Sequence, residues 1–382
     1  MATTASRVLA YCRAEEAWLL ETIEALVGLE SPTDDKAAVD RCGTELQERL
    51  EAIGGRVSVV SSPTAGDHLR TEFGKGPKQL LLLGHFDTVW NVGQLARMPL
   101  SRDGERLRGP GIFDMKGGIA IGMLATRAVL DAFPTETHRI VMLWTSDEET
   151  GSKTSRALIE TEAVRSDAVL VLEPSLPGGV LKTSRKGCGE YELVVHGVPA
   201  HAGVDPGKGV SAIRELARQL LAVETLQDLD RGVSLNAGII SGGSRPNVIA
   251  EEARARIDAR APTRSDADRV DRAMRQLTPH LQGARIEITG GFERPPMERT
   301  EGVARLFEIA RAAGQELGID VQEGSTGGGS DGNFCAAIGV PTLDGLGAIG
   351  NGAHALDEHV VVPALVPRAA LLANLLAKLA QS

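Results

Sequence analysis

Aromatic residues are scarce in this chain. Trp, Tyr and Phe together make up 3% of its 382 residues, whereas hydrophobic residues as a whole reach 42%. That content is enough for a sizeable core, but the core must be built from Leu, Val, Ile and Ala. At about 100–200 residues per domain, the length predicts about two domains.

Positive charge is also in short supply. The chain carries 41 Lys and Arg against 51 Asp and Glu, which gives a net charge of −10 at pH 7 and a pI near 5.4. Phosphate backbones are bound by concentrated Lys and Arg, so this balance argues against nucleic acid as a partner. The acidity is typical of a protein kept in solution by its charge.

Two further absences concern cysteine and long apolar runs. The four cysteines lie far apart and form no Cys-x-x-Cys pair: Cys12, Cys42, Cys188 and Cys335. We expect reduced, packed thiols of a cytosolic protein and no disulfide frame. No stretch of about 18 uninterrupted apolar residues is present, so no membrane span is expected. Residues 1–18 contain Ala-Glu-Glu-Ala-Trp where a signal peptide needs an uncharged apolar segment, which predicts a cytoplasmic protein.

Three short apolar runs are present, at residues 79–84, 139–144 and 168–172. Runs of this length that are apolar on both faces are typical of strands buried in a parallel or mixed sheet. Helical periodicity predicts helices at 4–30, 37–53, 117–133 and 152–163. Strands that alternate with helices in this way predict an α/β domain whose mixed, mostly parallel sheet is covered by helices.

The pattern changes near residue 185. Strand-like and helix-like segments then follow at 190–195, 208–224, 235–240, 252–258, 265–280 and 284–289. The order strand, helix, strand, strand, helix, strand is that of a ferredoxin-like unit. We therefore predict a discontinuous first domain, residues 1–185 and 295–382, interrupted by an inserted α+β domain, residues 186–294.

Metal-binding residue types gather where the apolar runs end. His85, Glu148 and Glu173 each come after such a run, and in α/β sheets ligands bind beyond the carboxyl ends of the strands. Histidine and carboxylate side chains bind hard or borderline metal ions. Asp87 faces the same way as His85 and could hydrogen-bond the ring nitrogen that His85 does not give to a metal. The alternative is an ordinary polar pair in a surface turn.

Asp114 and His354 extend this set. Asp114 lies in the segment 109–118, whose four glycines and one proline let the backbone approach another group closely. Its carboxylate could bridge two cations, or it could cap the helix that follows. His354 lies in Gly-Asn-Gly-Ala-His, and His359 follows shortly after it. The sequence pattern gives little reason to prefer one of these two histidines as the ligand.

Glu148 and Glu149 follow Asp147, so three consecutive acids end a strand. In an enclosed site one of the two glutamates could bind metal. The other could then act as a general base whose pKa is set by the metal charge and by burial. The alternative is a solvated loop that enters a helix, where acids are favourable.

Together these residues resemble the zinc peptidases and amidohydrolases of the M20 type, most closely the glutamate carboxypeptidase (carboxypeptidase G2-like) branch. The resemblance covers nearly the whole chain. The matching segments are Gly84–Val89, Gly109–Gly118, Asp147–Ser152, Glu173-Pro174, His201–Gly203, Asn247–Ile249 and Thr326–Asp331. It implies a catalytic α/β domain with an inserted dimerisation or lid domain, and a homodimer.

The resemblance also implies a metal centre. Asp114 would bridge two zinc ions, His85 and Glu173 would complete one site, and Glu149 and His354 would complete the other. Glu148 would be the general base, Asp87 would orient His85, and the bond from Asp114 to Met115 would be cis. Co²⁺ or Mn²⁺ could substitute, because this ligand set suits several divalent ions. Many relatives carry another acid where this chain has Met115, but that side chain need not be a ligand.

Residues outside the metal centre match substrate-binding positions. His201 would reach the site of the neighbouring subunit and steady the oxyanion. Asn247, Arg294 and, as a weaker match, Arg260 would grip a carboxylate or the developing negative charge. Thr326, Gly327 and Gly328 lack the ending of a phosphate loop, but backbone amides there could form an anion nest. Without the resemblance, Arg294 would equally be a solvated arginine beside a domain hinge.

The expected reaction is hydrolysis of an amide that releases an amino acid with a free α-carboxylate, as a glutamate carboxypeptidase does. One alternative within the family is deacylation of an N-acyl amino acid such as acetylornithine or succinyl-diaminopimelate. An alternative of another class is a non-catalytic relative that binds metal or peptide. Nucleotide binding has only the glycine-rich loops in its favour, and their residues do not form a phosphate-loop motif.

Overall fold

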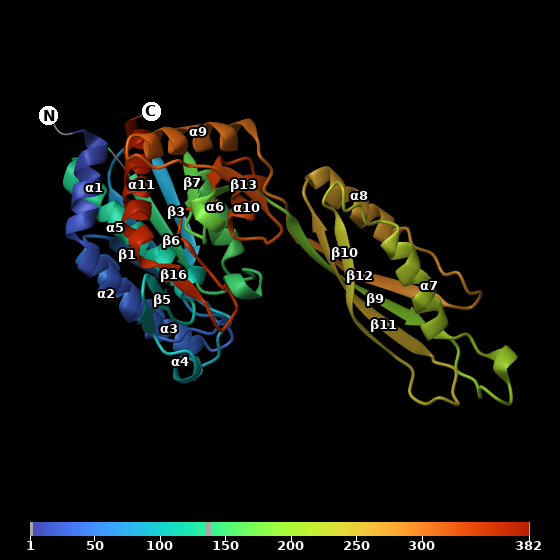
Figure 1. Ribbon diagram of the computed structural model, residues 1–382. Coiled ribbons are helices and arrows are strands. Elements are labelled where there is room, and N and C mark those ends of the chain that lie inside the picture. The colour runs from blue at the N-terminus through green and yellow to red at the C-terminus, as the bar shows by residue number, and fades with distance from the viewer. Residues whose placement is uncertain (1–2, 135–136, 138, 382) are drawn as a thin grey trace. The chain divides into compact units, whose positions relative to one another are not determined.

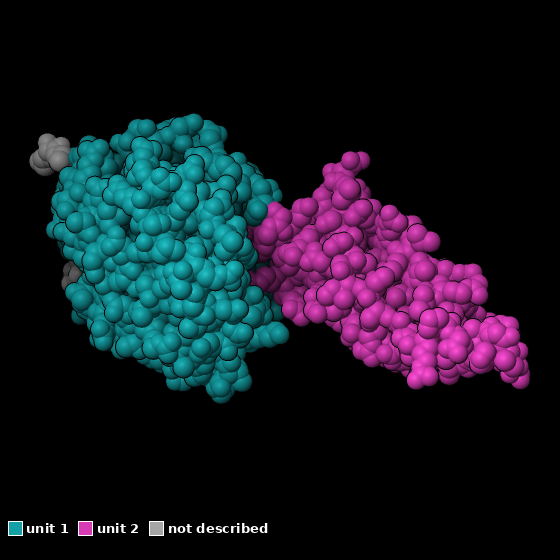
Figure 2. Space-filling model, turned by 60° about the horizontal axis from the view of Figure 1, so that its bottom comes forward, with its two compact units in different colours: residues 1–184, 299–326, 330–382 teal, residues 185–298, 327–329 magenta. Residues whose placement is uncertain are grey.

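The chain divides into two compact units in the computed structural model, which describes residues 3–134, 137 and 139–381 (Figures 1 and 2). Unit 1 comprises residues 1–184, 299–326 and 330–382, and unit 2 comprises residues 185–298 and 327–329. Figure 2 colours unit 1 teal and unit 2 magenta. Unit 1 is therefore assembled from segments on both sides of the insertion.

The unit boundaries differ from the expected domain boundaries at Arg185, at 295–298 and at 327–329, all of which belong to unit 2. Backbone pairing and one side chain explain the difference. Arg185 and Met297 exchange backbone hydrogen bonds of 2.9 and 3.0 Å. The Arg185 guanidinium donates to the carbonyl oxygens of Gly328 and Gly329 at 3.1 and 3.0 Å. A sequence pattern does not reveal such long-range contacts.

Unit 1 is built on a six-stranded sheet in the order β1-β2-β6-β3-β7-β14. The strands are β1 (Arg56–Val60), β2 (His68–Gly74), β6 (Arg139–Thr145), β3 (Gln79–His85), β7 (Ala168–Val171) and β14 (Thr342–Leu343). The pairs β6·β3, β3·β7 and β7·β14 are parallel, whereas β1·β2 and β2·β6 are antiparallel. The expected strands 79–84, 139–144 and 168–172 thus form the centre of the sheet, whereas the sequence analysis predicted neither β2 nor β14.

Alternate residues of β3 point to opposite faces of the sheet, as the two-residue period of a strand requires. Leu80 and Leu82 belong to the larger core cluster, and Leu81 and Leu83 to a smaller one. The larger cluster packs under α1 (Thr4–Ala14), α2 (Glu16–Val27), α3 (Lys36–Ala52), α5 (Gly117–Ala132), α9 (Glu301–Gln315) and α11 (Val362–Gln381). The smaller cluster packs under α6 (Arg156–Val164) and α10 (Gly332–Ala337). Figure 1 shows these helices on the two sides of the sheet.

Short elements complete unit 1. They are α4 (Gln94–Arg97), β4 (Ser101–Asp103), β5 (Arg106–Arg108), β8 (Leu181–Arg185, of which Arg185 belongs to unit 2), β13 (Glu323–Thr326), β15 (Gly350–Asn351) and β16 (His359–Val361). β15, β16, β5 and β4 form one small sheet, and β13 pairs with β8. The expected helix at 4–30 divides into α1 and α2, because Glu15 leaves the helical conformation.

One helix among the described residues, α11, is long and apolar enough to cross a membrane by composition alone. It contains Pro367 and Arg368, and 78% of its most apolar 18-residue stretch is buried inside the structure. Packing against α5, α1 and α9 accounts for this apolar character. The helix is therefore read as a core element of unit 1.

Unit 2 has the ferredoxin-like order that the sequence predicts. Its elements are β9 (Gly187–His196), α7 (Ala212–Glu224), β10 (Ser234–Gly242), β11 (Glu252–Ala261), α8 (Arg264–Arg275) and β12 (Arg285–Arg294). The strands form an antiparallel sheet in the order β10-β11-β9-β12. Its core cluster combines residues of α7, α8 and the strands. The expected fold class, an α/β domain with a ferredoxin-like insertion, is confirmed, although α8 ends before Thr278-Pro279 and not at residue 280.

Candidate metal centre

The sheet of unit 1 brings three acidic or histidine-bearing segments to one edge. β3 lies between β6 and β7 and runs parallel to both, so the carboxyl ends of all three strands meet there. His85 is the last residue of β3. Glu148 and Glu149 begin a short 3₁₀ turn just after β6, and Glu173 follows β7 by two residues.

Asp114 reaches this edge from the segment that precedes α5. The neighbouring Met115 is fully buried, and its Sδ lies 3.3 Å from the backbone nitrogen of His85. Gly84 makes this contact possible, because a Cβ there would lie 2.3 Å from Cε of Met115. The bond from Asp114 to Met115 is cis, as the resemblance implied. The Met115 side chain thus packs beneath β3.

His354 comes from the C-terminal segment of unit 1, between β15 and β16. Its backbone has a φ of 62°, the left-handed conformation that non-glycine residues rarely adopt. The turn is closed by a hydrogen bond of 2.8 Å from the Ala355 amide to the Gly352 carbonyl. The His354 side chain is half exposed, whereas that of His85 is 1% exposed. His359, which the sequence barely separated from His354, lies on β16 and its Nδ1 contacts the Asp357 carbonyl.

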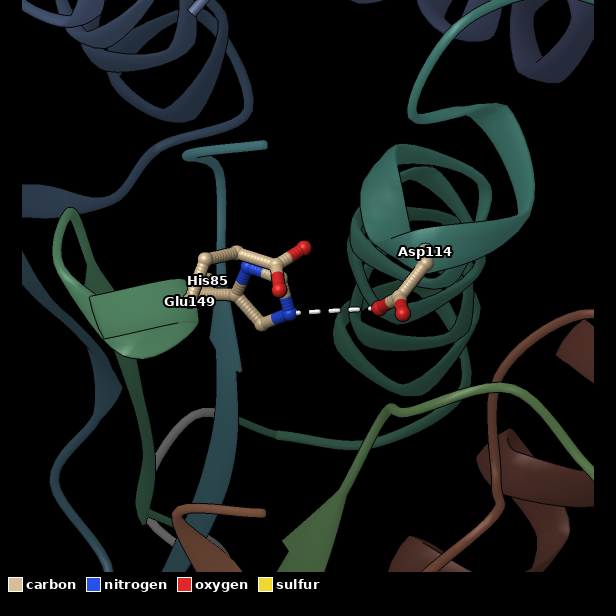
Figure 3. A group of neighbouring side chains, drawn as sticks. All are labelled: His85, Asp114 and Glu149. Carbon is tan, nitrogen blue, oxygen red and sulfur yellow. Dashed lines mark ion pairs between the residues drawn. The ribbon is translucent and has the colours of Figure 1, made fainter. Parts of the chain in front are cut away.

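The five expected ligand side chains converge. Nε2 of His85 lies 3.3 Å from Oδ1 of Asp114 and 3.4 Å from Oε1 of Glu173. Nε2 of His354 lies 3.5 Å from Oδ2 of Asp114 and 3.2 Å from Oε1 of Glu149. The two oxygens of Asp114 therefore face two different histidines. Figure 3 shows His85, Asp114 and Glu149 turned toward one another, with the ion pair of His85 and Asp114 dashed.

The electrostatics of this group are those of a site built for positive charge. Burial works to lower the pKa of His85, but Asp114, Asp87 and Glu173 outweigh it and hold that pKa well above its usual range. Asp114 and Glu149 raise the pKa of His354 to about 10. Burial works to raise the pKa of Asp114, but His354 and His85 hold it below its usual range. Burial raises the pKa of Glu149.

These residues fit a divalent metal ion. Ligand atoms of His85, Asp114 and Glu149 all lie within 4.8 Å of one another. Oδ1 of Asp114 is buried and receives no hydrogen bond of acceptable geometry in the described structure, which is costly unless a cation or water compensates it. Two imidazoles and three carboxylates are a donor set that suits Zn²⁺ and similar ions. The group could therefore hold metal, with Glu173 and His354 at its two sides.

Asp87 connects the histidine to the acidic pair. Nδ1 of His85 lies 3.0 Å from the Asp87 carbonyl oxygen and 3.3 Å from the Asp87 carboxylate. The backbone carbonyl is therefore the hydrogen-bond partner of this ring nitrogen. The carboxylate itself is fully buried and accepts the backbone N–H groups of Glu148 and Glu149 at 3.3 and 3.2 Å. Thr33 Oγ1 donates to it at 2.7 Å.

Six of the expected substrate residues lie in unit 2, and four of them lie outside the glycine-rich segment: His201, Asn247, Arg260 and Arg294. His201 and Asn247 lie side by side, because the Asn247 carbonyl accepts the Ala202 amide at 2.9 Å. Nδ1 of His201 accepts the amides of Gly203 and Val204, both at 3.1 Å, so the proton of a neutral ring sits on the exposed Nε2. Arg260 pairs with Asp258 at 2.7 Å and contacts the Cys188 thiol. Arg294 is 8% exposed, so the solvated-arginine alternative is wrong.

The residues of the expected anion nest are divided between the two units by sequence. Thr326 ends β13 in unit 1, whereas Gly327 and Gly328 belong to unit 2. The Gly328 carbonyl is held by Arg185.

Sequence reasoning missed two residues beside the metal centre, Thr33 and Glu358. Their partners are one buried carboxylate and a set of backbone amides, which leave no spacing pattern in a sequence.

Comparison with known proteins agrees with this geometry. A family model described as peptidase family M20/M25/M40 matches residues 81–378. Carboxypeptidase G2 of Pseudomonas sp. (strain RS-16) is 32% identical, covering 93% of this chain and 87% of that protein. A succinyl-diaminopimelate desuccinylase of Xanthomonas euvesicatoria pv. vesicatoria (strain 85-10) is 29% identical, covering 88% and 93%.

A solved structure shares the fold. The crystal structure of a tripeptidase from Staphylococcus aureus subsp. aureus mu50 matches with a TM-score of 0.78 and 23% identity, covering 96% of this chain and 99% of that chain. The family match, the identity to carboxypeptidase G2 and the described donor set point the same way. The chain belongs to peptidase family M20/M25/M40 and is a hydrolase of that family.

Proposed function

We propose that this protein is a two-metal hydrolase that cleaves an amide bond and releases an amino acid with a free α-carboxylate. The observation that carries the proposal is the position of Asp114, whose two carboxylate oxygens lie near two different histidines. One cation would be held by His85, Asp114 and Glu173. The other would be held by Asp114, Glu149 and His354. Zn²⁺ is the proposed metal, with Co²⁺ or Mn²⁺ as substitutes.

When bound, divalent cations at such a site would supply a lower pKa for a water molecule and polarisation of the scissile carbonyl. Glu148 is the proposed general base, and the backbone hydrogen bond to Asp87 fixes it beside Glu149. Its carboxylate takes one proton from the attacking water and delivers that proton to the amide nitrogen as the carbon–nitrogen bond breaks. The products are a carboxylic acid and an amine.

We further propose a glutamate carboxypeptidase activity. The similarity to carboxypeptidase G2 over most of both chains supports it. Arg294, Asn247 and, less directly, Arg260 would recognise the substrate carboxylate, and amides of Thr326, Gly327 and Gly328 would assist. The protonated Nε2 of His201 suits a donor to the oxyanion. In the proposed homodimer, His201 would serve the site of the neighbouring subunit.

A second candidate is an N-acyl-amino-acid deacylase of the acetylornithine or succinyl-diaminopimelate type. The similarity to a succinyl-diaminopimelate desuccinylase over most of both chains favours it. Both candidates share the metal centre and Glu148, and they differ in the acyl group and in the amine released. Substrate rates therefore separate them.

The test is amine release by the zinc-loaded protein from N-acyl-glutamates, N-acetylornithine and N-succinyl-diaminopimelate. We expect the highest kcat/KM on an N-acyl-glutamate. A preference for either of the other substrates would replace the carboxypeptidase proposal with the deacylase. Two bound metal equivalents without hydrolysis of any of these amides would favour the non-catalytic class.

Two neighbouring glutamates provide a matched pair of variants. Glu148→Gln should keep both metal equivalents and lose about 10²–10⁴-fold in kcat, because the base is removed and no ligand is changed. Glu149→Gln should instead lower the metal content toward one equivalent, measured by elemental analysis after dialysis. A Glu148→Gln enzyme with normal kcat would remove Glu148 from the role of base.

A further inference from the structure

Glu358 is a fully buried carboxylate that none of the proposed catalytic steps uses. It lies four residues after His354 and directly before β16. Burying a carboxylate is costly unless hydrogen bonds compensate it, so its partners show what it does in the fold.

Each oxygen of Glu358 accepts two hydrogen bonds. Oε1 accepts the backbone N–H groups of Phe113 and Asp114 at 2.9 and 3.0 Å. Oε2 accepts the backbone N–H of Gly111 at 2.9 Å and the indole N–H of Trp90 at 2.8 Å. Four donors occupy the lone-pair positions that an ionised carboxylate offers. Three of these donors belong to the short segment that presents Asp114.

The same carboxylate joins three segments, each of which carries a residue of the metal centre. Trp90 follows Asp87 by three residues, and the segment 111–114 ends in Asp114. Glu358 itself closes the turn 355–358, which begins directly after His354, through a hydrogen bond of 3.1 Å from its amide to the Ala355 carbonyl. Its own carbonyl accepts the Gly109 amide at 3.4 Å. The spacing between the loops of Asp114 and His354 is thus fixed at Glu358.

We propose that Glu358 is a positioning residue of the metal centre, which holds the backbone of 111–114 so that Asp114 stays between His85 and His354. The inference rests on the metal-binding part of the proposed function and adds a residue that is not a ligand. Hydrogen bonds to a charged acceptor are the strong ones, so four of them hold this backbone firmly. Residues that orient metal ligands typically change metal affinity by about 10–100-fold when they are replaced.

Glu358→Gln is the variant that tests this role. Whichever way the new amide turns, its NH₂ group faces two N–H donors: either those of Phe113 and Asp114, or those of Gly111 and Trp90. At least one backbone N–H in 111–114 therefore loses its acceptor, while the size of the side chain is unchanged.

Glu215→Gln is the matched control. Glu215 is also fully buried and accepts the backbone N–H groups of His280 and Leu281 at 2.9 and 2.7 Å, together with the Gln219 side chain at 2.7 Å. The exchange removes the same charge and deprives at least one backbone N–H of its acceptor. It does so in unit 2, whereas all five ligand side chains belong to unit 1.

The measurement is the zinc affinity of the full-length variants, by competition with a chromophoric chelator, together with the melting temperature of the metal-free proteins. We expect Glu358→Gln to bind zinc about 10–100-fold more weakly than wild type, and Glu215→Gln to stay within about twofold. A purely structural role would lower the melting temperature of both variants and leave both affinities unchanged. Wild-type affinity in folded Glu358→Gln would overturn the proposal.

Glu358→Asp covers the case in which Glu358→Gln does not fold. It keeps the charge but is one methylene shorter, so it cannot keep all four hydrogen bonds, and the same affinity criterion applies. The proposed function can fail separately. Wild type that binds two zinc ions and hydrolyses none of the amides would refute the activity and leave this test intact. An active Glu358→Gln enzyme with unchanged affinity would refute only the role of Glu358.

Discussion

Asp87→Asn should weaken both the fold and the catalytic centre, through different hydrogen bonds of one buried group. Oδ1 of Asp87 accepts the Glu148 amide, and Oδ2 accepts the Glu149 amide and the Thr33 hydroxyl. An asparagine can present its oxygen to only one of these sides. Either the Glu148 or the Glu149 amide therefore faces an NH₂ group and loses its acceptor.

The expected size of each effect follows from this geometry. A buried N–H without an acceptor costs about 1–3 kcal/mol. That loss corresponds to roughly 2–12 °C in the melting temperature of the metal-free protein, at about 2–4 °C per kcal/mol. Because the displaced amides belong to the proposed base and a proposed ligand, kcat/KM should also fall by about 10–100-fold. Thermal unfolding of the metal-free protein and steady-state amine release measure the two effects.

Glu162→Gln separates these effects. Glu162 is 2% exposed and binds the side chains of Gln79, Arg70 and Arg165 at 3.2, 3.0 and 3.1 Å. Gln79 is the first residue of β3 and His85 is the last, so Glu162 lies at the other end of the strand. The control should lose stability and keep its kcat/KM. If Asp87→Asn retains kcat/KM as well as the control does, the positioning argument for Asp87 is wrong.

Two further predictions concern the metal and a glycine. Because Asp114 and Glu149 raise the pKa of His354 to about 10, and that of His85 is also raised, both rings carry protons near pH 7 in the metal-free protein. Zinc binding should therefore release about two protons, and the zinc affinity should weaken as the pH falls. The measurement is the binding enthalpy by calorimetry in buffers of different ionisation enthalpy. A binding enthalpy that is the same in all buffers would contradict the prediction. Gly347→Ala would place a Cβ 2.1 Å from the Leu172 carbonyl and 2.8 Å from that of Glu173, so it should lower both the melting temperature and the metal content. Gly207→Ala is the control, because a Cβ at Gly207 meets open space, and it should change neither the melting temperature nor the metal content. Equal melting temperatures and metal contents in the two variants would contradict the close-approach argument.

Much of the fold was predictable because β3, β6 and β7 are apolar on both faces and each ends at a change of composition. The same ends carry His85, Glu148 and Glu173, so the edge of the site could be inferred from local pattern alone. β2 was missed because its alternating residues, which include Arg70 and Glu72, form no continuous apolar run.

The rest of the site depends on contacts between distant segments. Asp114 and His354 are 240 positions apart, and periodicity does not reveal that they meet. Nor does it reveal that the Asp87 carboxylate binds backbone amides of 148 and 149. Glu358 follows Asp357 in what the sequence presents as a polar stretch, although the fold buries it completely. For such groups the resemblance supplied expectations that local chemistry could not.

The discontinuity of unit 1 has a consequence for biosynthesis. The core cluster of unit 2 lies within residues 191–292, whereas unit 1 needs α11, the last helix of the described chain. At about 5–20 residues per second, roughly 10–40 s separate the emergence of Glu173 from that of His354. The synthesis of unit 2 begins later than that of unit 1. Its core residues nevertheless have all left the ribosome before those of unit 1. Until α11 has also emerged, the nascent strands of unit 1 expose apolar surface that chaperones would have to shield.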